Sequence, residues 1–187
     1  MKTYTIFAGV NGAGKTSIYK SIYYNENKDE KRINTDEMVA RVGSWKDNNL
    51  QVQCAREAVK LIKQYILEGI SFNQETTLSG RSIIKNIKLA KENGFYIVMN
   101  YIGVNNVEIA KERVKLRVNK GGHGIPDTDI ERRYYDSLNN LNKVIKICDE
   151  INIYDNTDIL KEIIDFKEGK IIWKDENLPT WTSNIFK

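Results

Sequence analysis

The sequence predicts an α/β fold in which a mostly parallel sheet carries helices on both faces, as a three-layer sandwich. Short apolar runs typical of strands alternate with segments of helical periodicity from one end of the chain to the other. No linker rich in proline, glycine or serine and no internal repeat interrupts this alternation. We therefore expect one domain that covers residues 1–187.

The expected elements follow in chain order. Strands rich in β-branched and aromatic residues are predicted at 3–9, 32–34, 70–74, 95–102 and 151–154, with a hairpin around Glu168 and Gly169. Helices are predicted at 15–23, from 34 onward, at 50–68, 81–93 and 107–120, and from 127 to about 149. Thr35 or Asp36 is the expected cap of the second helix, and Gly69 is expected to end the third.

Composition narrows the classes of protein to consider. Hydrophobic residues make up 41% and charged residues 29% of 187 positions, which favours a globular core over disorder. A net charge of +4 does not by itself indicate a nucleic acid or membrane partner. The chain shows neither a signal peptide nor an apolar run long enough to span a membrane, so we expect a cytoplasmic location. Cys54 and Cys148 lack metal-ligand spacing and are expected to be buried apolar residues.

The segment GVNGAGKTS, residues 9–17, carries the strongest signal. It fits the pattern G-x-x-x-x-G-K-[ST] between a strand and a helix, where glycines and a helix N-terminus surround a phosphate chain. In such a P-loop, Lys15 would reach the β- and γ-phosphates and the Thr16 hydroxyl would bind Mg²⁺. The alternative is a glycine-rich turn with an incidental lysine. The predicted nucleotide-binding residues here are Gly9, Asn11, Gly12, Ala13, Gly14, Lys15, Thr16 and Ser17.

Other motifs separate the classes of nucleotide-using proteins. The N-K-x-D guanine reader of GTPases is missing from the sequence. The run VIKICDE, residues 144–150, resembles the acidic strand end of ATPase motors, but Lys146 interrupts it and helical periodicity continues through it. We therefore assign Asp149 and Glu150 a structural or solvated role. These observations favour a small-molecule kinase.

A kinase needs a base and a group that grips the acceptor, and two carboxylates follow predicted strands. Asp36 could take the proton of an acceptor hydroxyl, or merely cap a helix. Glu75 could grip acceptor hydroxyls or water bound to Mg²⁺, or be an ordinary polar loop residue. The segment FNQETTLSGRS adds Thr76, Thr77 and Arg81 as candidate substrate contacts.

A basic lid is predicted at about residues 107–137. Arg113 and Arg117 are four residues apart on one helix, Gly121 and Gly122 form a hinge, and Arg132 and Arg133 lie on the next helix. The alternative is a solvated or RNA-binding surface, although little aromatic interleaving makes nucleic acid unlikely. His123, the only histidine, lies in the hinge; it could contact phosphate or orient the lid, and we expect mainly a structural hydrogen-bonding role.

Taken together, the ordered motifs resemble those of small zeta-toxin-like kinases, over almost the whole chain. The match runs through GVNGAGKTS, NTDEM, FNQETTLSGRS, YIGVNNVEIAKERVKLRVNKGGHGIP, IERRYYDSLNNL, IYDNT and LPTW. The stretch RVKLRVNKGGHGIP, residues 113–126, is the most specific of these, and the P-loop is the least. The chain is shorter than classical zeta toxins, and small members vary on the acceptor side of the cleft.

The resemblance implies a P-loop kinase that uses ATP and Mg²⁺ to phosphorylate the 3′-hydroxyl of the sugar in UDP-N-acetylglucosamine, and a cognate antitoxin. It implies that Asp36 is the general base and that Glu75 holds the acceptor. Arg117 and Arg133 would be the lid arginines, although Arg132 competes for the second place, and Arg113 and His123 would support them. Asp155 and Asn156 would lie near the adenine. Two alternatives stay open: another small-molecule or dinucleotide acceptor, or a regulatory nucleotide-binding module that contacts protein or RNA.

Overall fold

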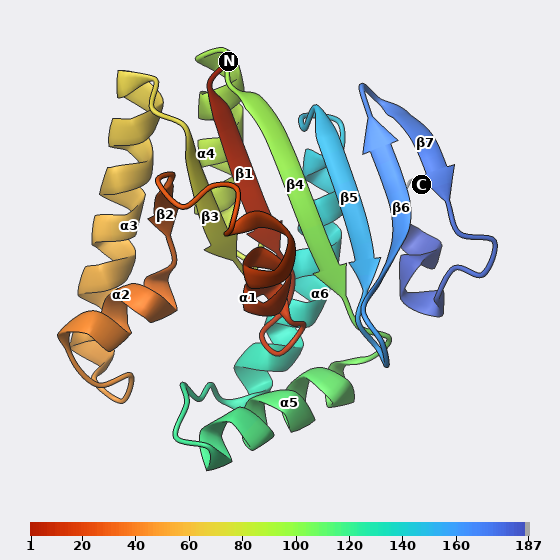
Figure 1. The fold of residues 1–187 in the computed structure, drawn as a ribbon. Coiled ribbons are helices and arrows are strands. Elements are labelled where there is room, and N and C mark those ends of the chain that lie inside the picture. Colours follow the sequence, from red (N-terminus) through yellow and green to blue (C-terminus); the bar gives the residue numbers. More distant parts are fainter. Residues whose placement is uncertain (186–187) are drawn as a thin grey trace.

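A single mixed sheet organises the computed structural model, which describes residues 1–185 (Figure 1). Its strand order is β2-β3-β1-β4-β5-β6-β7. The first five strands in that order are parallel, and β6 and β7 are antiparallel to their neighbours. The strands are β1 (Thr3–Ala8), β2 (Lys31–Ile33), β3 (Phe72–Thr76), β4 (Tyr96–Gly103), β5 (Glu150–Asp155), β6 (Lys161–Lys167) and β7 (Lys170–Lys174). The predicted, mostly parallel sheet is confirmed.

Helices cover both faces of this sheet, as predicted. The helical segments are α1 (Lys15–Ile18), the π-helical η1 (Tyr19–Tyr23), α2 (Thr35–Val42), α3 (Asn48–Glu68), α4 (Arg81–Glu92), α5 (Val107–Asn119), α6 (Asp127–Val144) and the 3₁₀ helix η2 (Thr180–Asn184). Side chains alternate along β1, so Ile6 joins a core cluster with α3, α4 and α6, whereas Phe7 joins a second cluster with α1, η1 and α5. None of the helices within residues 1–185 is long and apolar enough to cross a membrane.

The parallel strands determine where the loops meet. Each of β1, β3 and β4 is followed by a helical crossover, so their carboxyl ends lie at the same edge of the sheet. Figure 1 shows α1, α5 and the beginning of α6 gathered at this edge. Ligands of doubly wound folds bind outside such an edge.

Two predicted helix boundaries are wrong. The cap of α2 is Asn34, whose side chain accepts hydrogen bonds from the backbone N–H groups of Asp36 and Glu37, so neither Thr35 nor Asp36 is the cap. The last long helix ends at Val144 and not near Asp149. The Asp149 carboxylate accepts a 2.8 Å hydrogen bond from the backbone N–H of Ile97, which confirms its structural role.

Several local predictions are confirmed. Cys54 and Cys148 are buried and free. Gly69 ends α3 in the left-handed conformation, with φ 69°. The β6–β7 hairpin turns at Glu168 and Gly169, where φ is 50° and 81°, as a two-residue turn of this hand requires.

Candidate active site

The glycine-rich loop forms a tight cradle between β1 and α1. Gly12 and Gly14 have φ of 81° and 101°, and a Cβ on Gly12 would lie 2.6 Å from the carbonyl oxygen of Ala110. The buried Lys15 ammonium donates a 3.1 Å hydrogen bond to the carbonyl of Val10, which is its only hydrogen bond to residues 1–185. Burial lowers the pKa of Lys15, while Glu75 and Asp36 act in the opposite direction. A buried cation with unused N–H donors above a backbone cradle fits a phosphate chain.

A carboxylate network lies beside the loop hydroxyl. Thr16 Oγ1 donates to Glu75 Oε1 at 2.8 Å, and Glu75 Oε2 accepts from Arg32 Nη2 at 2.7 Å and from Asn34 Nδ2 at 3.0 Å. Glu75 is therefore held by its neighbours and lies against the P-loop. Arg32, which also pairs with Glu37, was missed by the sequence analysis because a basic residue in a short strand carries no motif.

The oxygen atoms around Thr16 fit Mg²⁺ better than a metal that needs a protein cage. Within residues 1–185 there is no group of three or more histidine, cysteine or acidic residues placed to hold a metal. Mg²⁺ prefers few protein oxygens together with water and substrate phosphates. The Thr16 hydroxyl and the Glu75 carboxylate supply such oxygens next to the phosphate cradle.

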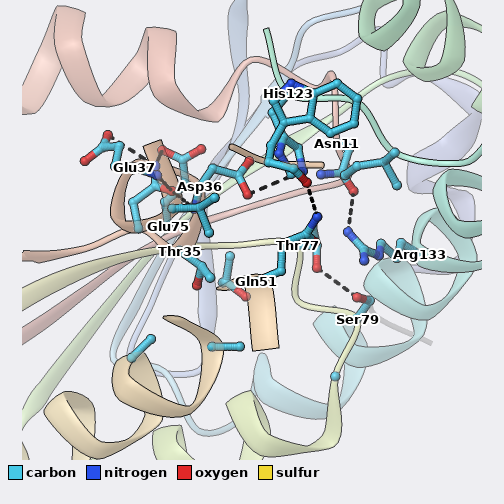
Figure 2. Close-up of a pocket in the computed structure, with 18 of the residues that line it drawn as sticks. Asn11, Thr35, Asp36, Glu37, Gln51, Glu75, Thr77, Ser79, His123 and Arg133 are labelled. Carbon is cyan, nitrogen blue, oxygen red and sulfur yellow. Dashed lines mark hydrogen bonds and ion pairs between the residues drawn. The ribbon is translucent and has the colours of Figure 1, made fainter. Parts of the chain in front are cut away.

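Asp36 lies in the first turn of α2 and faces the lid. Its side chain is 49% exposed, and its Oδ1 lies 3.9 Å from Nε2 of His123 (Figure 2). The His123 ring packs edge-on against Trp45, with 5.4 Å between ring centroids. Burial lowers the pKa of His123, Asp36 opposes this shift, and Arg117 and Arg133 add to it. Burial thus favours the neutral imidazole beside a half-exposed carboxylate.

Two arginines of the predicted lid line the cleft above the P-loop. Arg117 Nε donates to the backbone carbonyl of His123 at 2.8 Å, and its buried Nη2 has no partner within residues 1–185. Arg133 Nη1 donates to the side-chain oxygen of Asn11 in the P-loop at 3.2 Å, as Figure 2 shows. An unpaired guanidinium N–H and a guanidinium on the P-loop both fit an anionic ligand at this position.

The other two arginines face elsewhere. Arg132 lines the cleft, but it is engaged in ion pairs with Asp129 at 2.9 Å and Asp136 at 3.4 Å on its own helix. Arg113 donates to the backbone carbonyls of residues 156 and 157 and is not among the residues that line the cleft. The four-residue spacing that predicted a shared role for Arg113 and Arg117 therefore does not bring both to the cleft.

Asp155 ends β5, and Asn156 follows it next to the P-loop. Asn156 Nδ2 donates to the backbone carbonyl of Ala13 at 2.8 Å. The buried Asp155 carboxylate accepts from Trp181 Nε1 and from the Thr157 hydroxyl, both at 2.8 Å. Neither residue lines the main cleft.

One large cleft of about 1200 Å³ connects these groups with a region that the sequence analysis did not predict. Of the candidate substrate contacts, Thr76 and Thr77 line it and Arg81 does not. Its far end is formed by α3 and α4 through Gln51, Ala55, Ala58, Val59, Ile62, Ile83 and Asn86. The apolar members of this set repeat at helical spacing, so in the sequence they resemble ordinary core positions.

Comparisons with known proteins identify the family of this chain. The zeta toxin family model matches residues 1–164. A Haemophilus influenzae protein, described as uncharacterized, is 38% identical over 128 residues, which cover 68% of this chain and 89% of that protein.

Two solved structures share the fold. The AvrRxo1-ORF1:ORF2 crystal structure with ATP has a TM-score of 0.73 at 15% identity, covering 91% of this chain and 60% of that chain. The PezAT chromosomal toxin–antitoxin structure of Streptococcus pneumoniae has a TM-score of 0.61 at 18% identity, covering 88% of this chain and 70% of that chain. The chain thus spans 60% of the length of the first of these structures. The family match covers most of the sequence, and the chain belongs to the zeta toxin family and has its P-loop kinase fold.

Proposed function

We propose that this protein is an ATP-dependent kinase that transfers the γ-phosphate to a hydroxyl of a nucleotide-sugar. The acceptor we propose is the 3′-hydroxyl of the sugar in UDP-N-acetylglucosamine, with the protein acting as the toxin of a toxin–antitoxin pair. The observation that carries the proposal is that Asp36, Lys15 and Arg133 line a single cleft. A base, a phosphate cradle and mobile cations are the parts that phosphoryl transfer requires.

The nucleotide-binding half of the proposal rests on the P-loop. Its backbone N–H groups and Lys15 would hold the β- and γ-phosphates of ATP, with Gly12 and Gly14 supplying the required curvature. Thr16 and Glu75 would hold Mg²⁺, directly or through water, and the ion when bound would neutralise charge on the phosphate oxygens. Glu75 is engaged with Thr16 and Arg32, which supports the magnesium-side role over direct contact with the acceptor.

The chemical step would use groups on opposite sides of the cleft. Asn34, and not Asp36, caps α2, so the Asp36 carboxylate is available to accept the proton of the attacking hydroxyl. Arg117 and Arg133 would stabilise the negative charge of the transferring phosphoryl group. Arg133 contacts the P-loop whereas Arg132 is paired on its own helix, which favours Arg133 as the second lid arginine.

The proposals for the partner and for the acceptor rest on the relatives of this chain. The structures described as AvrRxo1-ORF1:ORF2 and as the PezAT toxin–antitoxin system contain a partner or antitoxin, which supports a cognate antitoxin for this chain. UDP-N-acetylglucosamine is the acceptor implied by the zeta toxin resemblance. The cleft of about 1200 Å³ has room for a nucleotide-sized acceptor beside the phosphates of ATP.

Mass spectrometry of UDP-N-acetylglucosamine incubated with ATP, Mg²⁺ and the purified protein tests the proposal. We expect the gain of one phosphoryl group, lost in Lys15→Ala. Asp36→Asn should lower kcat by about 100- to 10,000-fold because it removes the general base, while ATP affinity stays nearly unchanged. Asp29→Asn, a change at an exposed position before β2, is the matched control and should keep full activity.

Two outcomes would count against the proposal in different ways. Transfer to other metabolites but not to nucleotide-sugars would change the acceptor and keep the kinase. ATP binding with no transfer to any acceptor, and partner binding that does not depend on Asp36, would instead favour a regulatory nucleotide-binding module.

A further inference from the structure

Arg32, the middle residue of β2, binds two carboxylates beside the cleft and does not line the cleft itself. Its Nη2 donates to Glu75 Oε2 at 2.7 Å and to Glu37 Oε1 at 2.9 Å, and its Nε donates to both oxygens of Glu37 at 3.2 Å. The Arg32 side chain is 12% exposed, and that of Glu75 is 11% exposed. Because the guanidinium lies outside the cleft, its effect on the site passes through the residues that it holds.

The guanidinium of Arg32 is also fixed on its other sides. Its Nη1 donates to Asn73 Oδ1 at 3.1 Å, and its Cζ lies 3.5 Å from the centroid of the Tyr19 ring. Asn73 is itself held, because its Nδ2 donates to Glu30 Oε2 at 2.7 Å. A planar guanidinium that is hydrogen-bonded along its edges and stacked on a ring has a single orientation. Arg32 therefore keeps a fixed separation between the groups that it contacts.

The two carboxylates belong to different parts of the site. Glu75, on β3, accepts from Thr16 Oγ1 at 2.8 Å, next to the phosphate cradle. Glu37 lies in the first turn of α2, directly after Asp36. Asp36, Glu37 and Glu75 all line the cleft (Figure 2). Arg32 thus connects the turn that carries the proposed base with the carboxylate proposed for the magnesium side.

The charge and the shape of Arg32 are both needed between these carboxylates. Glu37 and Glu75 lie close together, since Asn34 Nδ2 is 3.2 Å from Oε1 of the first and 3.0 Å from Oε2 of the second. The Asn34 amide carries no charge and cannot offset the repulsion between two carboxylates. A guanidinium offsets it and donates to both from one plane, whereas the ammonium of a lysine is a single point charge without this fork.

We propose that Arg32 is a positioning residue that sets the separation between the two parts of the site. Through Glu37 it holds the α2 turn that carries Asp36, and through Glu75 it holds the carboxylate beside the P-loop hydroxyl. The inference rests on the proposed function, because it takes Asp36 to be the base and Glu75 to lie on the magnesium side. Arg32 lies outside the cleft, so it is not itself a catalytic residue.

The first measurement concerns the contact of Arg32 with Glu75 and needs no acceptor. Calorimetry gives the dissociation constant of a non-hydrolysable ATP analogue with Mg²⁺ and with EDTA in its place. Arg32→Lys keeps the charge and loses the fork, so it should weaken binding with Mg²⁺ by about 10- to 100-fold, as changes behind metal ligands do. Binding in EDTA should stay within about twofold, because Lys15 is held by the loop itself, through the Val10 carbonyl.

The second measurement concerns the contact of Arg32 with Glu37. Glu37→Gln leaves the bond between Arg32 and Glu75 in place, so the effect of Mg²⁺ on analogue binding should stay as in the wild type. Initial rates of acceptor phosphorylation should show a kcat lower by about 10- to 100-fold, because the turn that carries Asp36 is displaced. The KM of the acceptor should change by less than about threefold. A higher KM with unchanged kcat would contradict the inference, because Glu37 would then act by direct contact with the acceptor.

Thermal unfolding separates positioning from folding. Lys91→Gln breaks an ion pair with Asp149, which binds the backbone at the start of β4 and lies outside the cleft. This control should lower Tm slightly and leave kcat and the effect of Mg²⁺ unchanged. An Arg32 that acts only in folding would behave in the same way: Arg32→Lys would lower Tm and keep both functional values. If Arg32→Lys does not fold, Glu37→Gln, which retains the arginine, decides the question.

The inference fails if Arg32→Lys keeps the wild-type kcat and the wild-type effect of Mg²⁺, or if it loses analogue affinity equally with Mg²⁺ and in EDTA. Its failure can be distinguished from failure of the proposed function. Transfer by the wild type that Arg32→Lys leaves unchanged would overturn the positioning role and keep the kinase. A lost effect of Mg²⁺ in Arg32→Lys, with no transfer by the wild type to any acceptor, would overturn the proposed reaction and keep the role of Arg32 beside the P-loop.

Discussion

The two ends of the cleft are built in different ways. The phosphate end is mainly one continuous segment, residues 9–17, in which backbone groups and Lys15 surround the site. The end that we propose for the acceptor is assembled from side chains on α3 and α4, which are separated by a strand and its loops in the sequence. The first is held by backbone conformation and by buried contacts to the loop. The second depends on which side chains of the packed helices α3 and α4 face the cleft.

This difference indicates how each end can change. A cradle of backbone N–H groups tolerates few substitutions because glycines at positive φ contact other parts of the chain. A pocket lined by helix side chains can change its ligand by single substitutions that leave the backbone as it is. We therefore expect the kinase chemistry to be rigid and the choice of acceptor to be adjustable.

The largest effect is expected where the loop backbone is crowded. Gly12 and Gly121 have nearly equal φ, 81° and 83°, but a Cβ on Gly12 would lie 2.6 Å from the Ala110 carbonyl, whereas a Cβ on Gly121 would meet nothing within 4 Å. Gly12→Ala should weaken ATP binding by at least about 100-fold, because the loop must shift and its N–H groups then no longer point at the same phosphate site. Gly121→Ala carries only the strain of positive φ, about 1 kcal/mol.

Titration of both variants with ATP, together with their Tm values, checks this prediction. The Gly121→Ala protein is the control for backbone strain without collision. Equal ATP affinity in the two variants would show that the cradle tolerates a side chain and that its rigidity is not what distinguishes it from the acceptor end.

The comparison also explains what could be predicted from the sequence. The P-loop motif could be recognised from the sequence because it needs particular residue types at fixed spacing in one segment, and the structure has the expected strand and helix on either side of it. The sheet and its crossovers followed from apolar periodicity, which reports burial directly. The α2 cap was misassigned because Asn34, Thr35 and Asp36 are all good capping residues and only the backbone conformation distinguishes them.

The parts that were missed depend on long-range packing. Arg32 gains its role from Glu75 and Glu37, and a lone arginine in a strand predicts neither contact. Asn86 lies in a helix whose apolar stripe marks one buried face, so the sequence does not show that the amide lines a cleft. Arg113 and Arg117 share a helix face, but they lie four residues, about 6 Å, apart along α5. Arg117 therefore contacts the backbone of His123, whereas Arg113 contacts the loop after β5.

A smaller effect on kcat is expected in the lid, where Arg132 and Arg133 form a matched pair of neighbouring arginines. Arg133→Gln should lower kcat by about 100- to 1000-fold, because it removes a preorganised donor from the charge that develops during transfer. Arg132→Gln breaks exposed ion pairs with Asp129 and Asp136 and should change kcat by less than about threefold. Initial rates of acceptor phosphorylation at saturating ATP measure both. Equal losses in the two variants would mean that the lid acts through its total charge and not through one placed guanidinium.

The smallest effect concerns His123, which lines the cleft beside Asp36. It is the only histidine of the chain, so its ring signals in NMR need no assignment. Its pKa should lie below the ordinary value of 6.5, because burial disfavours the imidazolium. Asp36→Asn should lower the pKa further, since the Asp36 carboxylate favours the charged ring, while Asp175→Asn on the far edge of the sheet should leave it unchanged.

The shift has a consequence for stability with a definite sign. Because the folded-state pKa of His123 is lower than the unfolded one, the unfolded chain takes up the proton first as the pH falls below 6.5. The free energy of unfolding should therefore be constant above that pH with respect to this group and decrease below it, until the folded-state pKa is passed. His123→Gln should remove this part of the pH dependence, measured by denaturant unfolding between pH 5 and pH 8. A His123 pKa that does not change in Asp36→Asn would show that the lid and the base are not in contact in solution, and a pKa at or above 6.5 would show that burial does not dominate the titration of the ring.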